Sequence, residues 1–158
     1  YQGRLYMKQG KTEEAYEKLE DVIFSEYTIL NLAFGIMITK ALEKNDPGYA
    51  RFLAEKICAL AGVFEMGKYS ECAAMLNIVT AEKNVEGTFQ VAKQLLENVD
   101  TICDFQNSEL YRHMKFREVK NPYTKEMKKE LLLGFQDEKE FAYMKGYEPW
   151  EKLLADFR

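Results

Sequence analysis

Residues 3–22 constrain the fold of this chain most strongly, because they read as two helices joined by one tight turn. Gly10 divides the stretch, and without a Cβ it can take a left-handed turn conformation at no steric cost. Thr12 follows with acidic residues behind it, a combination that favours the start of a helix. One apolar face then follows at spacings of four and three residues, formed by Ala15, Leu19 and Val22. The stretch therefore predicts an antiparallel helical hairpin.

This hairpin resembles one unit of a tetratricopeptide repeat, and the resemblance assigns a role to its small residues. It implies that Gly3 lets the second helix pack closely and that Tyr6 fills the space beside it. It also implies that Ala15 lies where the two helix axes approach each other. An ordinary amphipathic hairpin is the alternative, since it would show the same apolar spacing.

The spacing of the hairpin recurs along the chain. The pattern that begins at Gly10 returns 35 positions later at Asn45, and it returns again at Gly87. The first interval is close to the roughly 34 residues of a tetratricopeptide repeat, and the second interval is longer. Gly67 begins a further match that is out of phase with the alternation of helices. The pattern therefore describes, in part, any helix that follows a glycine turn.

Composition favours an all-α domain, because helix-forming residues are abundant, strand-like alternation is scarce and proline occurs only three times. We expect a tetratricopeptide-like antiparallel solenoid, an α-α superhelix, with a C-terminal helical cap. Repeats are expected in residues 1–116, and capping helices in residues 117–158 packed on the same domain. The first expected helix ends at residue 9. The following helices are expected at 12–25, 27–44, 48–66, 69–82, 86–104, 108–116 and 123–135, and two short helices are expected after Asp137 and at Pro149.

Two of these helices carry more specific expectations. Helix 27–44 is apolar nearly all round, which predicts burial between neighbouring helices. The last helix carries Trp150, which we expect to dock on the preceding helices and seal the end of the array.

Net charge argues against nucleic acid as a direct partner of this chain. The formal net charge is −4 and the pI is about 5.2, so the domain as a whole does not attract a polyanion. Cys58, Cys72 and Cys103 are odd in number, widely spaced and set in apolar patterns, which favours reduced, buried thiols. His113 is the single histidine and no CxxC is present, so no metal site is expected.

The sequence predicts no enzyme and no cofactor. It contains no glycine-rich phosphate loop, no G-x-S-x-G motif and no HExxH motif. The acidic residues near the N-terminus are expected to form one exposed helix face paired with Lys11 and Lys18, and they are Glu13, Glu14, Glu17 and Glu20.

The sequence also bears on where the protein acts. No signal peptide opens the chain, and no apolar run is expected to reach the length of a membrane span. We therefore expect a cytoplasmic domain. Because the chain begins at Tyr1 without an initiator methionine, we expect it to be a piece of a longer protein.

A second resemblance concerns the C-terminal third, in LYRHMKF at 110–116 and LLLGFQDEKEFAYMKGYEPWEKLL at 131–154. These stretches resemble the tail of bacterial transcriptional regulators that carry a lambda-repressor-type (XRE) helix-turn-helix followed by tetratricopeptide-like helices. The resemblance implies a homodimer, recognition of a short peptide or protein, and DNA contact only through a helix-turn-helix absent from this chain. The alternative is a free-standing tetratricopeptide scaffold that binds a protein partner and has no role in transcription.

Binding in such an array is expected on the concave surface, which the first helix of each pair lines. Asparagine side chains suit this surface, because one amide can both donate to and accept from a peptide backbone. A largely apolar peptide or the helix of a partner subunit is the expected ligand, since few basic residues are present. The residues expected there are Arg4, Met7, Lys8, Asn31, Gly35, Thr39, Leu42, Asn77 and Ala81.

Overall fold

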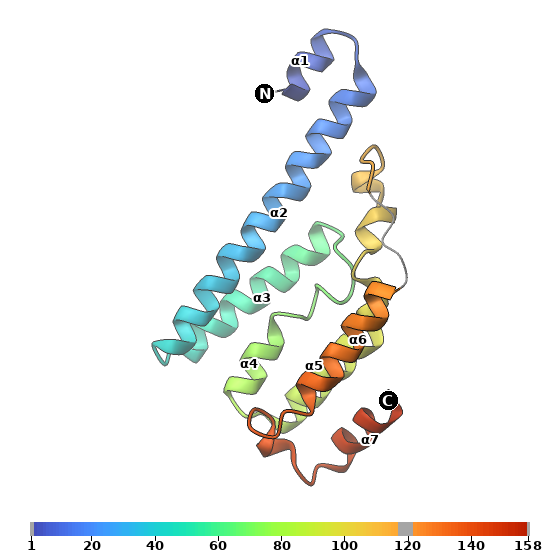
Figure 1. Ribbon diagram of the computed structural model, residues 1–158. Helices are drawn as coiled ribbons and strands as arrows, with labels where there is room; N and C mark the ends of the chain where they lie inside the picture. The colour runs from blue at the N-terminus through green and yellow to red at the C-terminus, as the bar shows by residue number, and fades with distance from the viewer. Residues whose placement is uncertain (1, 117–121, 158) are drawn as a thin grey trace.

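The computed structural model describes residues 2–116 and 122–157, and every regular element among them is helical (Figure 1). The all-α expectation is therefore confirmed for the described part of the chain. The α-helices are α1 (Gln2–Lys8), α2 (Thr12–Glu43), α3 (Pro47–Val63), α4 (Met75–Ala81), α5 (Val85–Asn98), α6 (Pro122–Phe135) and α7 (Glu148–Asp156). Short 3₁₀ turns are η1 (Val99–Thr101), η2 (Asp104–Asn107), η3 (Glu109–Tyr111) and η4 (Ala142–Met144).

The first hairpin forms as its spacing predicts. Gly10 has a φ of 71° and makes the turn between α1 and α2. A Cβ on Gly3 would lie 2.9 Å from the side chain of Leu19, so the missing side chain lets the two helices approach. Ala15 is fully buried at this contact. The close approach of α1 to α2 therefore depends on two small residues.

Replacing Ala15 with leucine is expected to lower the free energy of unfolding by about 1–3 kcal/mol, because the larger side chain overpacks a contact that has no free volume. The same replacement at the exposed Glu14 is the control and should cost less than about 0.5 kcal/mol. Urea denaturation of both variants measures the difference. Equal midpoints for the two would show that Ala15 does not lie at the helix contact.

Helix α2 differs from the expectation, because it is one continuous helix of 32 residues instead of two helices separated near residue 26. Ser25 and Glu26 do not break a helix in the way that glycine or proline does. At 1.5 Å per residue α2 is about 48 Å long. It packs against α1 near its start and against α3 along its second half (Figure 1). The expectation of two separate helices at 12–25 and 27–44, each belonging to a different helix pair, is therefore wrong.

Helix starts later in the chain follow local signals. The side chain of Asp46 accepts a hydrogen bond from Tyr49 N at 3.1 Å, and Pro47 stands in the first turn of α3. Asn84 caps α5 in the same way, accepting from Gly87 N at 2.8 Å. These caps satisfy backbone N–H groups that have no partner inside the helix.

Four expected helices are shorter or absent. Only Met75–Ala81 is α-helical within 69–82, and α5 ends at Asn98 before a run of 3₁₀ turns. In the segment 108–116 the regular part is η3, and beyond it the backbone N–H groups of His113 and Met114 donate to the side chain of Glu20. Met114 N also donates to Tyr111 O at 3.0 Å, which continues the 3₁₀ pattern by one residue. After Asp137 the chain forms only η4, although the Asp137 side chain accepts from two backbone N–H groups as expected of a cap.

The buried side chains form two clusters that meet at α4. The first cluster joins α2, α3 and η3, with Ile38, Ile57 and Tyr111 at its centre. The second joins α4, α5, α6 and α7 and includes Leu96 and Trp150. Helices from both sides of the expected boundary at 116–117 share the second cluster, and residues 117–121 themselves lie outside the described residues.

Trp150 docks on the preceding helices, as expected of a terminal cap. Its side chain is 4% exposed. The indole lies 5.5 Å from the ring of Phe135 and 5.4 Å from the ring of Phe141, measured between centroids. These aromatic contacts seal the end of the second cluster.

Candidate functional site

The outer face of α2 is apolar and exposed. We use this name for Ile29, Leu32, Ala33 and Ile36, which follow one another at helical spacing. The large side chains among them are 59% (Ile29), 66% (Leu32) and 55% (Ile36) exposed. Helix 27–44 was expected to be buried between neighbouring helices, and this expectation is wrong for the outer face. Contiguous apolar surface of this kind marks a site that binds a protein or a membrane.

The arrangement of the helices explains why this face is free. Tyr27, Ile38 and Ala41 turn to the other side of α2 and pack in the first cluster with α3. In Figure 1, α2 forms one edge of the molecule, and α3, α4 and the segment 104–116 all lie on one side of it. Helix α1 contacts α2 only near its start, around Ala15 and Leu19. Among residues 2–116 and 122–157, the second half of α2 is thus covered on one side only.

Helix α2 is also long and apolar enough to cross a membrane by length and composition. An 18-residue window within it has a mean hydropathy of 1.6, and 11% of that window is buried. The expectation that no apolar run reaches this length is therefore wrong. The inner face of the same helix packs in the first cluster through Tyr27, Ile38 and Ala41, whereas the outer face is exposed and Met37 beside it is 41% exposed.

A shallow groove of about 560 Å³ lies beside the outer face, between α2 and α4. Four of the nine residues expected at the binding surface line this groove: Asn31, Gly35, Thr39 and Asn77. Leu32 and Ile36 from the outer face complete its apolar wall, with Lys40 and Glu43 at one end. The structure thus brings together residues of α2 and α4 that are about 40 positions apart in sequence.

The other expected residues lie elsewhere. Arg4, Met7 and Lys8 are exposed on α1, and they do not line the groove. Leu42 is half-buried and packs against the first cluster. Ala81 is exposed at the end of α4, also outside the groove. A single concave surface through all nine residues does not form, because the continuous α2 places α1 and α4 at different positions along its length.

The groove offers backbone and amide groups beside its apolar wall. At Gly35 an added Cβ would meet nothing within 4 Å, so this part of α2 is open. Thr39 Oγ1 donates to Gly35 O at 3.0 Å and so turns its polar atom back to the helix. Within the described part of the chain, the amides of Asn31 and Asn77 have no hydrogen-bond partner. They are therefore available to a bound polypeptide.

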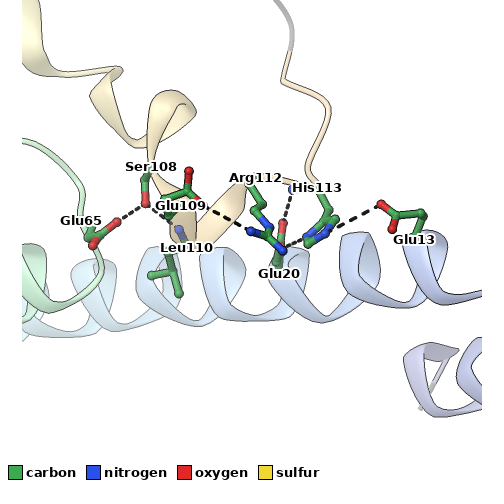
Figure 2. Close-up of polar contacts among 8 residues, drawn as sticks. All are labelled: Glu13, Glu20, Glu65, Ser108, Glu109, Leu110, Arg112 and His113. Atoms are coloured by element: carbon green, nitrogen blue, oxygen red, sulfur yellow. Dashed lines mark hydrogen bonds and ion pairs between the residues drawn. The ribbon is translucent and has the colours of Figure 1, made fainter.

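A second polar cluster lies on the inner side of α2, where Glu20 and His113 point toward each other (Figure 2). Glu20 is 7% exposed, and its carboxylate accepts from His113 N at 2.8 Å, from Met114 N at 3.1 Å and from His113 Nδ1. The imidazole stacks on Tyr16 with centroids 4.7 Å apart, and its Nε2 lies 3.8 Å from Glu13 Oε2. Glu20 was expected on an exposed face with Glu13, Glu14 and Glu17, and this expectation is wrong.

This cluster fastens a distant segment to α2. Glu20 and His113 are 93 positions apart, and three hydrogen bonds converge on one carboxylate. Nearby, Ser108 Oγ donates to Glu65 and accepts from Leu110 N at 3.0 Å (Figure 2). Carboxylates face both ring nitrogens of His113, Glu20 at Nδ1 and Glu13 at Nε2, and two backbone N–H groups also bind Glu20, so the geometry suits a structural contact. The described residues contain no group of three or more side chains suited to a metal ion.

The signal for Glu20 was present in the sequence. Ile23, Phe24 and Tyr27 follow Glu20 at three, four and seven positions, so all four share one helix face. A lone carboxylate on an apolar face indicates a buried, hydrogen-bonded group. No sequence signal indicated that Ile29, Leu32 and Ile36 would be exposed. An apolar side chain gives the same sequence pattern whether another part of the chain covers it or not.

The cysteines and the central tyrosine are half-buried or buried structural groups. Cys58, Cys72 and Cys103 are free thiols. Burial raises the pKa of the Cys72 thiol to about 11, which keeps it protonated and unreactive near neutral pH. Burial likewise raises the pKa of Tyr111 to about 12, and its hydroxyl donates to Phe64 O at 2.8 Å.

Comparisons of the chain with models of known protein families, with curated proteins and with solved structures found no match.

Proposed function

We propose that this chain is a non-catalytic protein-interaction domain whose outer α2 face binds an apolar helical segment of a protein. The observation that carries the proposal is the row of Ile29, Leu32 and Ile36, each more than half exposed on a helix whose opposite face is packed. Leaving such a row in water is unfavourable by about 25 cal/mol per Å² of apolar area. A partner that covers it recovers this free energy.

A helix fits this surface better than a small molecule does. Small-molecule sites enclose most of the ligand surface in a concave pocket, whereas the groove beside α2 is shallow and open. An amphipathic helix lays side chains at spacings of three and four along such a face. The amides of Asn31 and Asn77 lie at the border of the row and can hydrogen-bond the polar edge of a bound helix.

We place this interaction in a regulatory context, as the sensing and dimerisation part of a bacterial transcriptional regulator. The support is the resemblance of residues 110–116 and 131–154 to the tails of XRE-type regulators. A free-standing scaffold is the alternative. The residues encoded before Tyr1 distinguish the two, because a helix-turn-helix there supports a regulator and its absence supports the scaffold.

Site-specific photo-cross-linking tests the binding function. A benzophenone amino acid at position 32, introduced in the cells that naturally contain the protein, is expected to give a discrete protein adduct. The same group at Val63, an exposed apolar residue on α3, is the control and should give none. Adducts to lipid alone, or equal labelling at both positions, would contradict the proposal.

The groove amides provide a second variant. Exchanging Asn31 and Asn77 for alanine together is expected to abolish the adduct at position 32, because a bound helix then loses its polar contacts at one edge. Both side chains are exposed, so the melting temperature should fall by no more than a few degrees. An undiminished adduct in this double variant would show that the groove takes no part in binding.

A further inference from the structure

The exposed side of α2 carries a seven-residue repeat. Exposed residues run along it at alternating spacings of four and three, and they are Ser25, Ile29, Leu32, Ile36, Thr39 and Glu43. This spacing is the a and d pattern of a two-helix coiled coil. From Ser25 to Glu43 the row is about 27 Å long at 1.5 Å per residue. The row therefore has the spacing and the length to pair with one other helix.

We propose that the occupant of the outer α2 face is a second copy of this chain, whose α2 lies antiparallel to the first. This inference rests on the proposed function and names its partner. In an antiparallel pair each a residue packs against a d residue of the other helix. Centred near residue 34, the pairing packs Leu32 on Ile36 of the second copy and Ile29 on Thr39, and the two-fold axis repeats both contacts.

Charges beside the row select this arrangement. Glu26 and Lys40 occupy equivalent flanking positions, seven residues before and seven residues after Ala33. In the antiparallel pair, Glu26 of each copy therefore faces Lys40 of the other, and the contact occurs twice. In a parallel, in-register pair Asp21 would instead face Glu26 of the second copy, and these like charges repel.

The residues at the centre also suit two helices that approach closely. Ala33 and Gly35 flank the middle of the row, and an added Cβ at Gly35 would meet nothing within 4 Å. Lys40 pairs with Glu43 of its own helix at 2.6 Å, but both side chains are more than half exposed. The ammonium group can therefore turn to Glu26 of the second copy.

Analytical ultracentrifugation of the purified chain tests this proposal. The wild type is expected to sediment as a dimer at about 100 µM, a concentration that fills an interface of micromolar Kd. Leu32→Glu is expected to give a monomer, whereas Val63→Glu on α3 should remain a dimer. Circular dichroism of each variant confirms that it stays folded. A monomeric wild type, or a dimeric Leu32→Glu variant, would overturn the proposal.

Charge exchange tests the antiparallel orientation. Glu26→Lys alone and Lys40→Glu alone should each weaken the dimer about tenfold, because attractive contacts become repulsive at two symmetric places. The two changes together restore opposite charges and should return the Kd to within about threefold of the wild type. Failure of the combined variant to recover would overturn the antiparallel pairing.

The cross-linking experiment separates this inference from the proposed function. An adduct at position 32 with a second copy of the chain supports both. An adduct with a different protein overturns the second copy as occupant and leaves the binding function standing. An adduct with lipid alone overturns both.

Discussion

Replacing Trp150 with alanine is expected to lower the free energy of unfolding by about 3–5 kcal/mol, because the surrounding core collapses only partly around the lost volume. The indole is almost fully buried between Phe135 and Phe141 and closes the second cluster. Its loss removes apolar burial and two aromatic contacts at once. Denaturation by urea, followed by circular dichroism, measures the change.

Leu133→Ala is the matched control for this experiment. Leu133 lies on α6 next to the buried Leu132, but its own side chain is exposed. Its truncation should change stability by less than about 0.5 kcal/mol. If Trp150→Ala cost no more than the control, α7 would not be packed on the second cluster as described.

Replacing Glu20 with alanine is the second large change, with an expected loss of about 2–4 kcal/mol. The substitution leaves the backbone N–H of His113 and the His113 ring without their acceptor in a site shielded from water, and it leaves Met114 N with only its bond to Tyr111 O. It should also release the segment 108–114 from α2, because these hydrogen bonds hold its end. Hydrogen exchange at the amides of His113 and Met114 measures that local release directly.

Glu14→Ala provides the comparison on the same helix. Glu14 is exposed, so its removal should leave both global stability and the exchange of those two amides nearly unchanged. Protected amides at 113 and 114 in Glu20→Ala would contradict the structural role of the carboxylate.

The two faces of α2 have different consequences for the protein. The inner face holds the first cluster and the Glu20 contact, so changes there are expected to act on stability. In the part of the chain that the structure describes, the outer face stays exposed, so changes there are expected to act on association. A variant such as Leu32→Glu therefore separates binding from folding, provided its melting temperature stays near that of the wild type.

Much of the fold follows from local sequence signals. The first hairpin is specified by Gly3, Gly10 and Ala15. Only small residues allow α1 and α2 to approach closely, and glycine is the residue that most readily adopts the left-handed turn conformation. Asp46 with Pro47 and Asn84 mark the starts of α3 and α5, since caps depend on residues a few positions away. The all-helical class and the burial of Trp150 follow from composition and apolar spacing.

The candidate site was only partly predictable. One groove is lined by four of the expected residues, Asn31, Gly35, Thr39 and Asn77. The first three share a helix face because helical spacing is a local property, whereas Asn77 joins them because α4 lies beside this part of α2. Arg4, Met7 and Lys8 were grouped with them through an assumed repeat. That repeat required a break in α2 near residue 26, and no residue there provides one.

The sequence by itself determined the all-helical class, where most helices begin and which side chains share a face, because these depend on composition and on neighbours within about four positions. Only the tertiary structure supplied the hydrogen-bond partners of Glu20, since they lie 93 and 94 positions away. It also decided that Ile29, Leu32 and Ile36 stay exposed. Apolar spacing indicates that a helix face is stable when it is shielded from water, but the packing of the whole chain decides what covers that face. Here α3 and the segment 104–116 pack on the opposite side of α2.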